Sequence, residues 1–290
     1  MTIEDVVWIP SYPKSGNTWV HQVLKVAAET HGFPRNASMD AHELEKSAEE
    51  IPEFPKVKVS RNGCAVLKTH NQCDATGRAH PSLERLRPVG SIYVRRNPLD
   101  VLLSYINFSR IQYFNRKGKG EHYRKGLFRT LLGMKDVPDY QAWRGESLDS
   151  LPTKLLDHAL DYFSESGMLI PTLSHFGSWL DHNEVWQKAQ VDNKLLIYYE
   201  DCIQNLEAFS VLGTMFDFSD DEIRTAVRTR NDITNTAREA RSGKPDNKIF
   251  YNKMTSFYYV KYFSMAAISR FMVRHGDKLE SLGYVNLPLH

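Results

Sequence analysis

The sequence is poor in cysteine, in net charge and in long hydrophobic runs, and each shortage excludes a class of protein. Its three cysteines, Cys64, Cys73 and Cys202, are widely spaced and odd in number, so neither a disulfide framework nor a CxxC metal site is expected. A net charge of +2 gives no global reason to expect a nucleic acid or an anionic membrane as a partner. No stretch approaches the ~18 consecutive apolar residues of a membrane span.

The N-terminal residues also lack the basic segment and apolar run of a signal peptide, so we expect a reduced, cytoplasmic protein. The length of 290 residues, with 41% hydrophobic and 25% charged residues, is enough to bury a large core. There are no internal repeats and no low-complexity tract. We therefore expect one domain spanning residues 1–290.

The most informative stretch is Tyr12-Pro-Lys-Ser-Gly-Asn-Thr-Trp19. An apolar segment, Val6–Ile9, precedes it, and residues 20–28 follow it with apolar side chains at helical spacing. This order predicts a strand, a tight loop and a helix. The backbone N–H groups of such a loop, together with Lys14, can bind a phosphate or a sulfate. A plain turn with a solvated lysine is the alternative for so short a motif.

The loop is not a Walker A loop, because that motif needs an upstream glycine and a lysine directly after its last glycine. Here Lys14 precedes Gly16 and no upstream glycine is present. This order disfavours an ordinary ATPase or GTPase.

Three later stretches repeat the pattern of an apolar strand that ends in polar residues. They are Ala65–His70, Ser91–Pro98 and Lys194–Asp201. Helical patterns alternate with them, which predicts an α/β fold with a central parallel sheet flanked by helices. Ligands bind outside the carboxyl ends of the strands in such sheets, so Lys68, His70 and Arg96 are expected near the loop.

Other segments give weaker predictions. Residues 31–64 are polar and predict a surface segment with one short helix, whereas residues 110–150 are basic and rich in glycine, and suit a mobile lid or a solvated loop equally well. Helices are predicted at residues 206–216, at 220–229 with Ser219 as N-cap, and at 255–274.

Four of these stretches resemble, in order, the motifs of the soluble, cytosolic-type sulfotransferases, which use 3′-phosphoadenosine 5′-phosphosulfate (PAPS). The Tyr12–Trp19 string resembles their phosphosulfate loop, and Lys68-Thr69-His70 resembles the segment that carries their catalytic base. Arg96, with Ser104 eight residues later, resembles their 3′-phosphate site, and Tyr199-Glu200-Asp201 resembles the segment whose tyrosine contacts adenine. The resemblance implies the P-loop-kinase-like sulfotransferase fold.

The resemblance also implies a role for each matching residue. His70 is expected to be the general base, and Lys14 and Lys68 are expected to stabilise charge on the leaving nucleotide and the sulfuryl oxygens. No metal is implied. The residues expected to bind PAPS are Lys14, Ser15, Gly16, Asn17, Thr18, Trp19, Arg96, Ser104, Tyr199, Arg241 and Gly243.

The chain departs from the family's pattern at several points. Asn17 replaces the usual threonine, and Asn71-Gln72 replaces the common Leu-Pro, so we expect a different substrate wall there. The family's late Arg-Lys-Gly segment is matched only by Arg241-Ser-Gly-Lys244, and the dimerising segment is not evident, which leaves the oligomeric state open.

These observations predict a PAPS-dependent sulfotransferase that modifies a hydroxyl or amine of a small molecule and releases 3′-phosphoadenosine 5′-phosphate (PAP). The working hypothesis for the acceptor is a polar natural product, an alkaloid toxin among them. Two alternatives stay open: an ATP-dependent small-molecule kinase, and a sulfotransferase-like protein that binds nucleotide without catalysis.

Overall fold

A computed structural model describes most of the chain, namely residues 4–32, 38–41, 63–115, 130–133, 148–169, 176–239 and 257–284. The chain forms two compact units. The first comprises Met1–Arg96 and Asp181–Ala237, and the second comprises Asn97–Leu180 and Arg238–His290. The prediction of a single domain stays a prediction, and most of the predicted lid at 110–150 lies outside the described residues.

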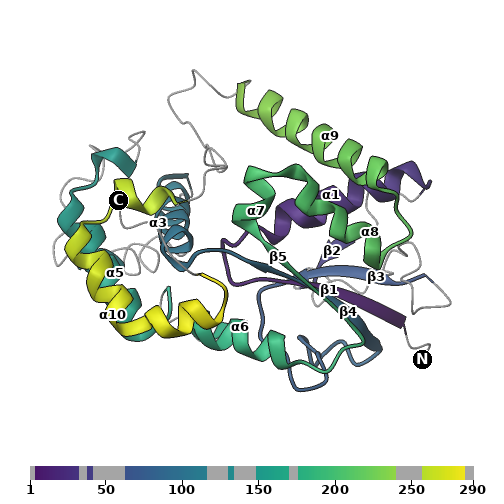
Figure 1. The fold of residues 1–290 in the computed structure, drawn as a ribbon, viewed down its shortest axis with the longest axis horizontal. Helices are drawn as coiled ribbons and strands as arrows, with labels where there is room; N and C mark the ends of the chain where they lie inside the picture. Colours follow the sequence, from purple (N-terminus) through teal and green to yellow (C-terminus); the bar gives the residue numbers. More distant parts are fainter. Residues whose placement is uncertain are drawn as a thin grey trace. The chain divides into compact units, whose positions relative to one another are not determined.

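The first unit is built on a parallel five-stranded sheet with the strand order β2-β3-β1-β4-β5 (Figure 1). The predicted α/β class is therefore confirmed. The strands are β1 (Glu4–Pro10), β2 (Ser38–Asp40), β3 (Ala65–Thr69), β4 (Leu86–Arg95) and β5 (Asn193–Tyr198). Strand β2 lies in the segment for which the sequence predicted only a surface loop and a short helix.

Both faces of the sheet are covered, which explains why the strands are nearly continuous apolar runs. Val7 and Ile9 of β1 point to one face, and Val6 and Trp8 point to the other. Helices α1 (Asn17–Thr30), α7 (Tyr199–Gln204), α8 (Val211–Met215) and α9 (Asp220–Glu239) lie together on the first of these faces in Figure 1. On the other face, Trp186 of α6 (Trp179–Lys188) packs on the sheet. So does Ala189, the residue that follows this helix.

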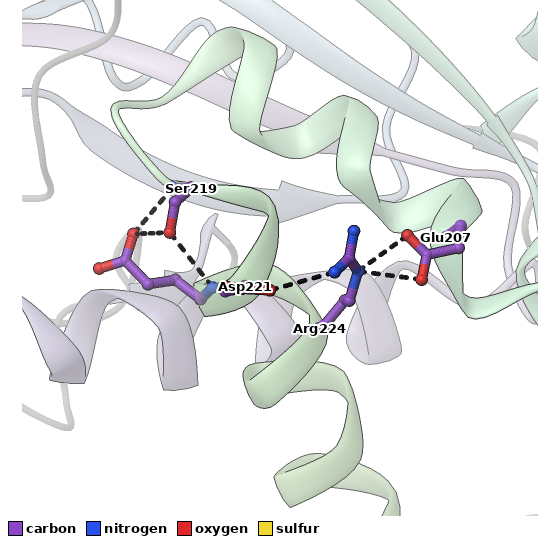
Figure 2. Close-up of polar contacts among 5 residues, drawn as sticks. Glu207, Ser219, Asp221 and Arg224 are labelled. Atoms are coloured by element: carbon purple, nitrogen blue, oxygen red, sulfur yellow. Dashed lines mark hydrogen bonds and ion pairs between the residues drawn. The ribbon is translucent and has the colours of Figure 1, made fainter.

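Helix α9 begins with a reciprocal capping box, which confirms the prediction for Ser219 (Figure 2). The Ser219 backbone N–H donates to a Glu222 carboxylate oxygen at 2.8 Å, and the Glu222 N–H donates to Ser219 Oγ at 3.3 Å. Arg224, one turn further on, pairs with Glu207 of the short helix η4 (Leu206–Ser210) at 2.9 Å. The helix predicted over residues 206–216 is in fact η4 followed by α8, two shorter pieces.

The described residues of the second unit form helices and short connections. Its elements are α3 (Pro98–Asn115), η2 (Leu148–Ser150), α5 (Thr153–Ser166), η5 (Tyr258–Lys261) and α10 (Met265–Ser281). Helices α5 and α10 pack through the stacked rings of Phe163 and Phe271, whose centroids are 6.2 Å apart. The Asp100 carboxylate on α3 is buried and accepts the backbone N–H groups of Phe257 and Tyr259 at 2.8 and 2.9 Å. The single C-terminal helix predicted over 255–274 is therefore η5 and α10 with a turn between them.

Candidate active site

The loop after β1 is tied to the end of β3, its neighbour in the sheet. Pro10 and Thr69 are the last paired residues of the two strands. Beyond them, the Ser11 N–H donates to the Thr69 carbonyl at 3.2 Å. The side chain of Asn17 donates to the same carbonyl at 3.3 Å. Asn17 thus links the start of α1 to β3. A carbonyl oxygen only accepts, so this contact needs a hydrogen-bond donor, which the Asn17 amide supplies.

The loop itself is tightly wound. Lys14 and Gly16 both have positive φ angles, of 74° and 105°, and the Ser15 N–H donates to the Tyr12 carbonyl at 3.1 Å. A left-handed lysine is strained, and such strain is typical of functional loops. The N-cap of α1 is Gly16, which has no side chain to accept the first N–H groups of that helix. A helix start built in this way favours a bound anion.

Tyr199 packs between Gly16 and Arg96. A Cβ atom on Gly16 would lie only 2.7 Å from the Tyr199 ring, and the Arg96 guanidinium lies over that ring, 4.2 Å from its centroid. Tyr199 also contacts Trp19 edge-on, with centroids 5.6 Å apart. Four residues that were predicted to bind the nucleotide are therefore neighbours: Gly16, Trp19, Arg96 and Tyr199.

Two cations meet at the loop. Arg96 donates from Nη1 to the Lys14 carbonyl at 3.1 Å. Burial, and then the charge of Arg96, lower the pKa of the Lys14 ammonium to about 7. Among the residues that the structure describes, the buried atoms Ser15 Oγ and Arg96 Nε have no hydrogen-bond partner. Buried donors and crowded positive charge fit a bound phosphate or phosphosulfate, because such an anion satisfies both.

His70 lies directly beside this loop, at the end of β3. Its Nδ1 atom is 2.8 Å from the carbonyl oxygen of Ser11, and the side chain is half-buried. A carbonyl oxygen only accepts, so Nδ1 carries the proton in the neutral ring. The lone pair is then on Nε2, and this is the tautomer that a general base needs.

Residues 69–71 are held by further contacts that the sequence did not indicate. The hydroxyl of Thr69 lies 2.9 Å from Nε2 of the buried His80, and it accepts the Asn71 N–H at 3.0 Å. The Asn71 side chain donates to the Ala79 carbonyl at 3.3 Å. Asn71, which departs from the family's pattern, thus stabilises its own loop. No spacing in the sequence links His80 to Thr69, so only the fold reveals the pair.

The structure brings most of the predicted residues to one edge of the sheet, at the carboxyl ends of β1, β3 and β4. These are the loop residues Lys14 to Trp19 together with His70, Arg96 and Tyr199. Lys68 is half-buried in β3, paired in register with Ile9 and Asp40 of the neighbouring strands. Ser104 lies half-buried on α3 in the second unit, so its predicted meeting with Arg96 stays a prediction. Arg241 and Gly243 lie outside the described residues.

The predicted end of β5 is also wrong. The sequence pattern predicts a strand that runs over Lys194–Asp201 and includes Tyr199, Glu200 and Asp201. Strand β5 ends at Tyr198, and Tyr199 is the first residue of α7, on which both carboxylates also lie. Tyr199 consequently leaves the sheet at the edge where the loop lies.

Comparisons with known proteins agree with this geometry. The model of the sulfotransferase domain family matches residues 4–276. One similar solved structure is that of mouse sulfotransferase SULT7A1 complexed with PAP, with 16% identity, a TM-score of 0.51, and coverage of 97% of this chain and 85% of that one. Another is retinol dehydratase in complex with androsterone and the inactive cofactor PAP, with 14% identity, a TM-score of 0.52, and coverage of 96% and 81%.

At such identities the two structures establish the fold, and the predicted sulfotransferase fold is confirmed. Within the described residues, no helix is long and apolar enough to cross a membrane. The family match covers nearly the whole chain. The chain therefore belongs to the sulfotransferase family, which confirms the enzyme class that its sequence predicts.

Proposed function

We propose that this sulfotransferase transfers the sulfuryl group of PAPS to a hydroxyl or amine of a small-molecule acceptor, in the cytoplasm, and releases PAP. The bond between sulfur and the bridging oxygen of the nucleotide breaks as the acceptor oxygen or nitrogen bonds to sulfur. The acceptor loses its proton to His70. Atoms and charge balance without any further reactant.

The residues of the loop hold the phosphosulfate in this proposal. Lys14, the first N–H groups of α1 and the hydroxyls of Ser15 and Thr18 surround the anion, and Lys68 stabilises the charge that develops in the transition state. Tyr199 and Trp19 contact the adenine. Arg96 binds the 3′-phosphate, with Ser104, Arg241 and Gly243 as its predicted partners.

The observation that carries the proposal is the hydrogen bond between His70 Nδ1 and the Ser11 carbonyl, at 2.8 Å. It links the proposed base to the residue that opens the phosphosulfate loop. The same contact selects the tautomer with the lone pair on Nε2, the nitrogen that is left to accept a proton. A half-buried lysine with a lowered pKa, an arginine and an imidazole with its lone pair on Nε2, all at one edge of a parallel sheet, suit sulfuryl transfer.

Our working hypothesis for the acceptor is a polar natural product or an alkaloid toxin. The departure from the common Leu-Pro after His70 and the basic segment at residues 110–150 support it. Since Asn71 makes internal contacts, Gln72 is the residue of that pair that we expect to affect acceptor choice.

Thermal unfolding with added PAP, and separately with ATP and Mg²⁺, tests the co-substrate. A ligand that binds only the folded protein stabilises it by about 2.7 kcal/mol at a hundredfold excess over its Kd. We expect a clear rise in Tm with PAP and little change with ATP. A rise with ATP alone would overturn the proposal and favour the kinase.

The role of His70 is tested with the His70→Ala variant. We expect kcat for sulfuryl transfer to fall by about 10²- to 10⁴-fold, because a general base contributes about that much. The Kd for PAP should stay unchanged, since no nucleotide contact is removed. An unchanged kcat would mean that another residue is the base. If neither the variant nor the wild-type protein turns over PAPS, the non-catalytic alternative is correct.

A further inference from the structure

His182, on α6, is completely buried and contacts the strand ends next to the proposed base. Its Nδ1 atom lies 2.8 Å from the Tyr93 hydroxyl of β4, and its Nε2 atom lies 3.0 Å from the main-chain carbonyl of His70. The ring of Tyr12 packs edge-on against it, with centroids 5.7 Å apart. No motif or spacing in the sequence distinguishes this histidine from the others.

The direction of each hydrogen bond follows from the acceptor at one end. The carbonyl oxygen of His70 only accepts, so His182 Nε2 carries a proton and donates. In the neutral ring Nδ1 then accepts, and the Tyr93 hydroxyl must be its donor. Burial, together with the nearby His70, lowers the pKa of His182 to about 3, so the ring is neutral near pH 7.

A second residue of α6 makes a similar contact, to the main-chain carbonyl of the residue that follows His70. Trp186 follows His182 by one helical turn, and its Nε1–H donates to the Asn71 carbonyl at 3.0 Å. Helix α6 thus holds two consecutive carbonyls, those of His70 and Asn71. The imidazole of His70 is held separately, by Ser11 at the end of β1.

We propose that His182 is a positioning residue for sulfuryl transfer: by donating to the main-chain carbonyl of His70 it fixes the backbone from which the base projects, and Tyr93 fixes the tautomer that can donate. The inference rests on the proposed function of His70. Ser11 holds the imidazole of His70, and α6 holds the main chain of His70. The Nε2 atom of His70 therefore keeps one orientation toward the acceptor. A displacement of about 1 Å at such a base can cost about 10²-fold in rate.

A purely architectural His182 would only dock α6 on the sheet. The two roles differ in what a substitution changes. Loss of docking lowers Tm and weakens nucleotide binding and catalysis together. Loss of positioning lowers kcat while the Kd of PAP and the KM of the acceptor stay near their wild-type values.

The experiment compares His182→Leu, His182→Gln and Tyr93→Phe in the full chain. Leucine fills the space but cannot donate, whereas the glutamine amide keeps a donor at the reach of Nε2. We expect kcat to fall by about 10- to 100-fold in His182→Leu, to recover to within about threefold in His182→Gln, and to fall by a smaller factor in Tyr93→Phe. Trp186→Phe is the matched control, because it removes the donation to Asn71 but leaves the contact to His70 intact.

Equal kcat values for His182→Leu and the wild type would overturn the proposal. So would a parallel loss of kcat and of PAP binding in both His182 variants. Tyr93→Phe keeps the test decisive if His182→Leu does not fold, because an unchanged kcat in that variant also contradicts it. Failure of the proposed function is seen separately, as activity retained by His70→Ala.

Discussion

The phosphosulfate loop at residues 12–19 and the start of α9 are both rich in polar groups, but these groups pair with one another more fully around α9 than at the loop. Around α9, Ser219 and Glu222 satisfy each other, and Arg224 lies between Glu207 and Asp221 (Figure 2). At the loop, Lys14 and Arg96 crowd two positive charges together, and Ser15 Oγ is buried without a hydrogen-bond partner among the described residues. The first arrangement is complete by itself, and we propose that an anion completes the second.

The comparison teaches how a stable fold can carry an unfavourable site. Exposed ion pairs contribute little to stability, and capping contributes about 1 kcal/mol. Strain, buried donors and like charges at the loop cost free energy in the protein without ligand. We infer that the well-packed core of the sheet offsets that cost, and we propose that an anion bound at the loop recovers it as affinity.

The largest effect is expected from Gly16→Ala. The added methyl group would meet the Tyr199 ring at 2.7 Å, on a backbone with a φ of 105°. We expect a loss of about 1–3 kcal/mol in the free energy of unfolding, with a large loss of PAP affinity, because the ring and the loop must move apart. Denaturant unfolding and calorimetric titration with PAP measure the two quantities.

Gly276→Ala is the matched control. This glycine lies within α10, where an added Cβ has Met272 as its nearest neighbour at 3.9 Å. Alanine should stabilise the helix by roughly 0.5–1 kcal/mol and leave PAP binding unchanged. A tolerated Gly16→Ala would show that the loop is less tightly packed on Tyr199 than the structure indicates.

An intermediate effect is expected from pH. The pKa of Lys14 is lowered to about 7 without ligand, and a bound anion raises it, so binding above pH 7 requires uptake of a proton. PAP affinity should therefore fall with rising pH, by up to ~10-fold per unit above pH 7. Calorimetry at pH 8 in buffers of different ionisation enthalpy should detect the proton taken up.

Lys14→Arg separates this lysine from the other titrating groups, because arginine stays protonated at these pH values. The variant should bind PAP without proton uptake and with a weaker dependence on pH between 7 and 9. The same uptake in the variant and the wild type would assign the titration to another residue.

The smallest effects are expected at α9. Ser219→Ala removes the cap and should cost about 1 kcal/mol in the free energy of unfolding. Arg224→Gln breaks the exposed pairs with Glu207 and Asp221 and should leave Tm almost unchanged. Neither change should affect PAP affinity, and a clear loss of affinity in either would end the contrast between the two regions.

Much of the site could be predicted because its residues are close in sequence. The loop, its lysine and the start of α1 fall within eight residues, from Tyr12 to Trp19. Lys68 and His70 follow one apolar run, and Arg96 follows another. Since parallel strands end at the same edge, each run predicts where its last residues lie.

Other features could not be predicted, either because the local pattern is too weak or because they join distant residues. Strand β2 is three residues long, too short for a periodic pattern. The end of β5 at Tyr198 was missed because apolar and aromatic residues continue into α7. His80 and His182 gain their roles from Thr69 and His70, which lie 11 and 112 residues away.

The sequence by itself determined the α/β class, the anion-binding loop and the sulfotransferase family, because these depend on local patterns of apolar, glycine and basic residues. Only the tertiary structure decided the tautomer of His70, the lowered pKa of Lys14, the packing of Tyr199 between Gly16 and Arg96, and the contact from His182. Each of these depends on burial and on the distance between separate strands and helices. Such distances are set by how the elements pack together.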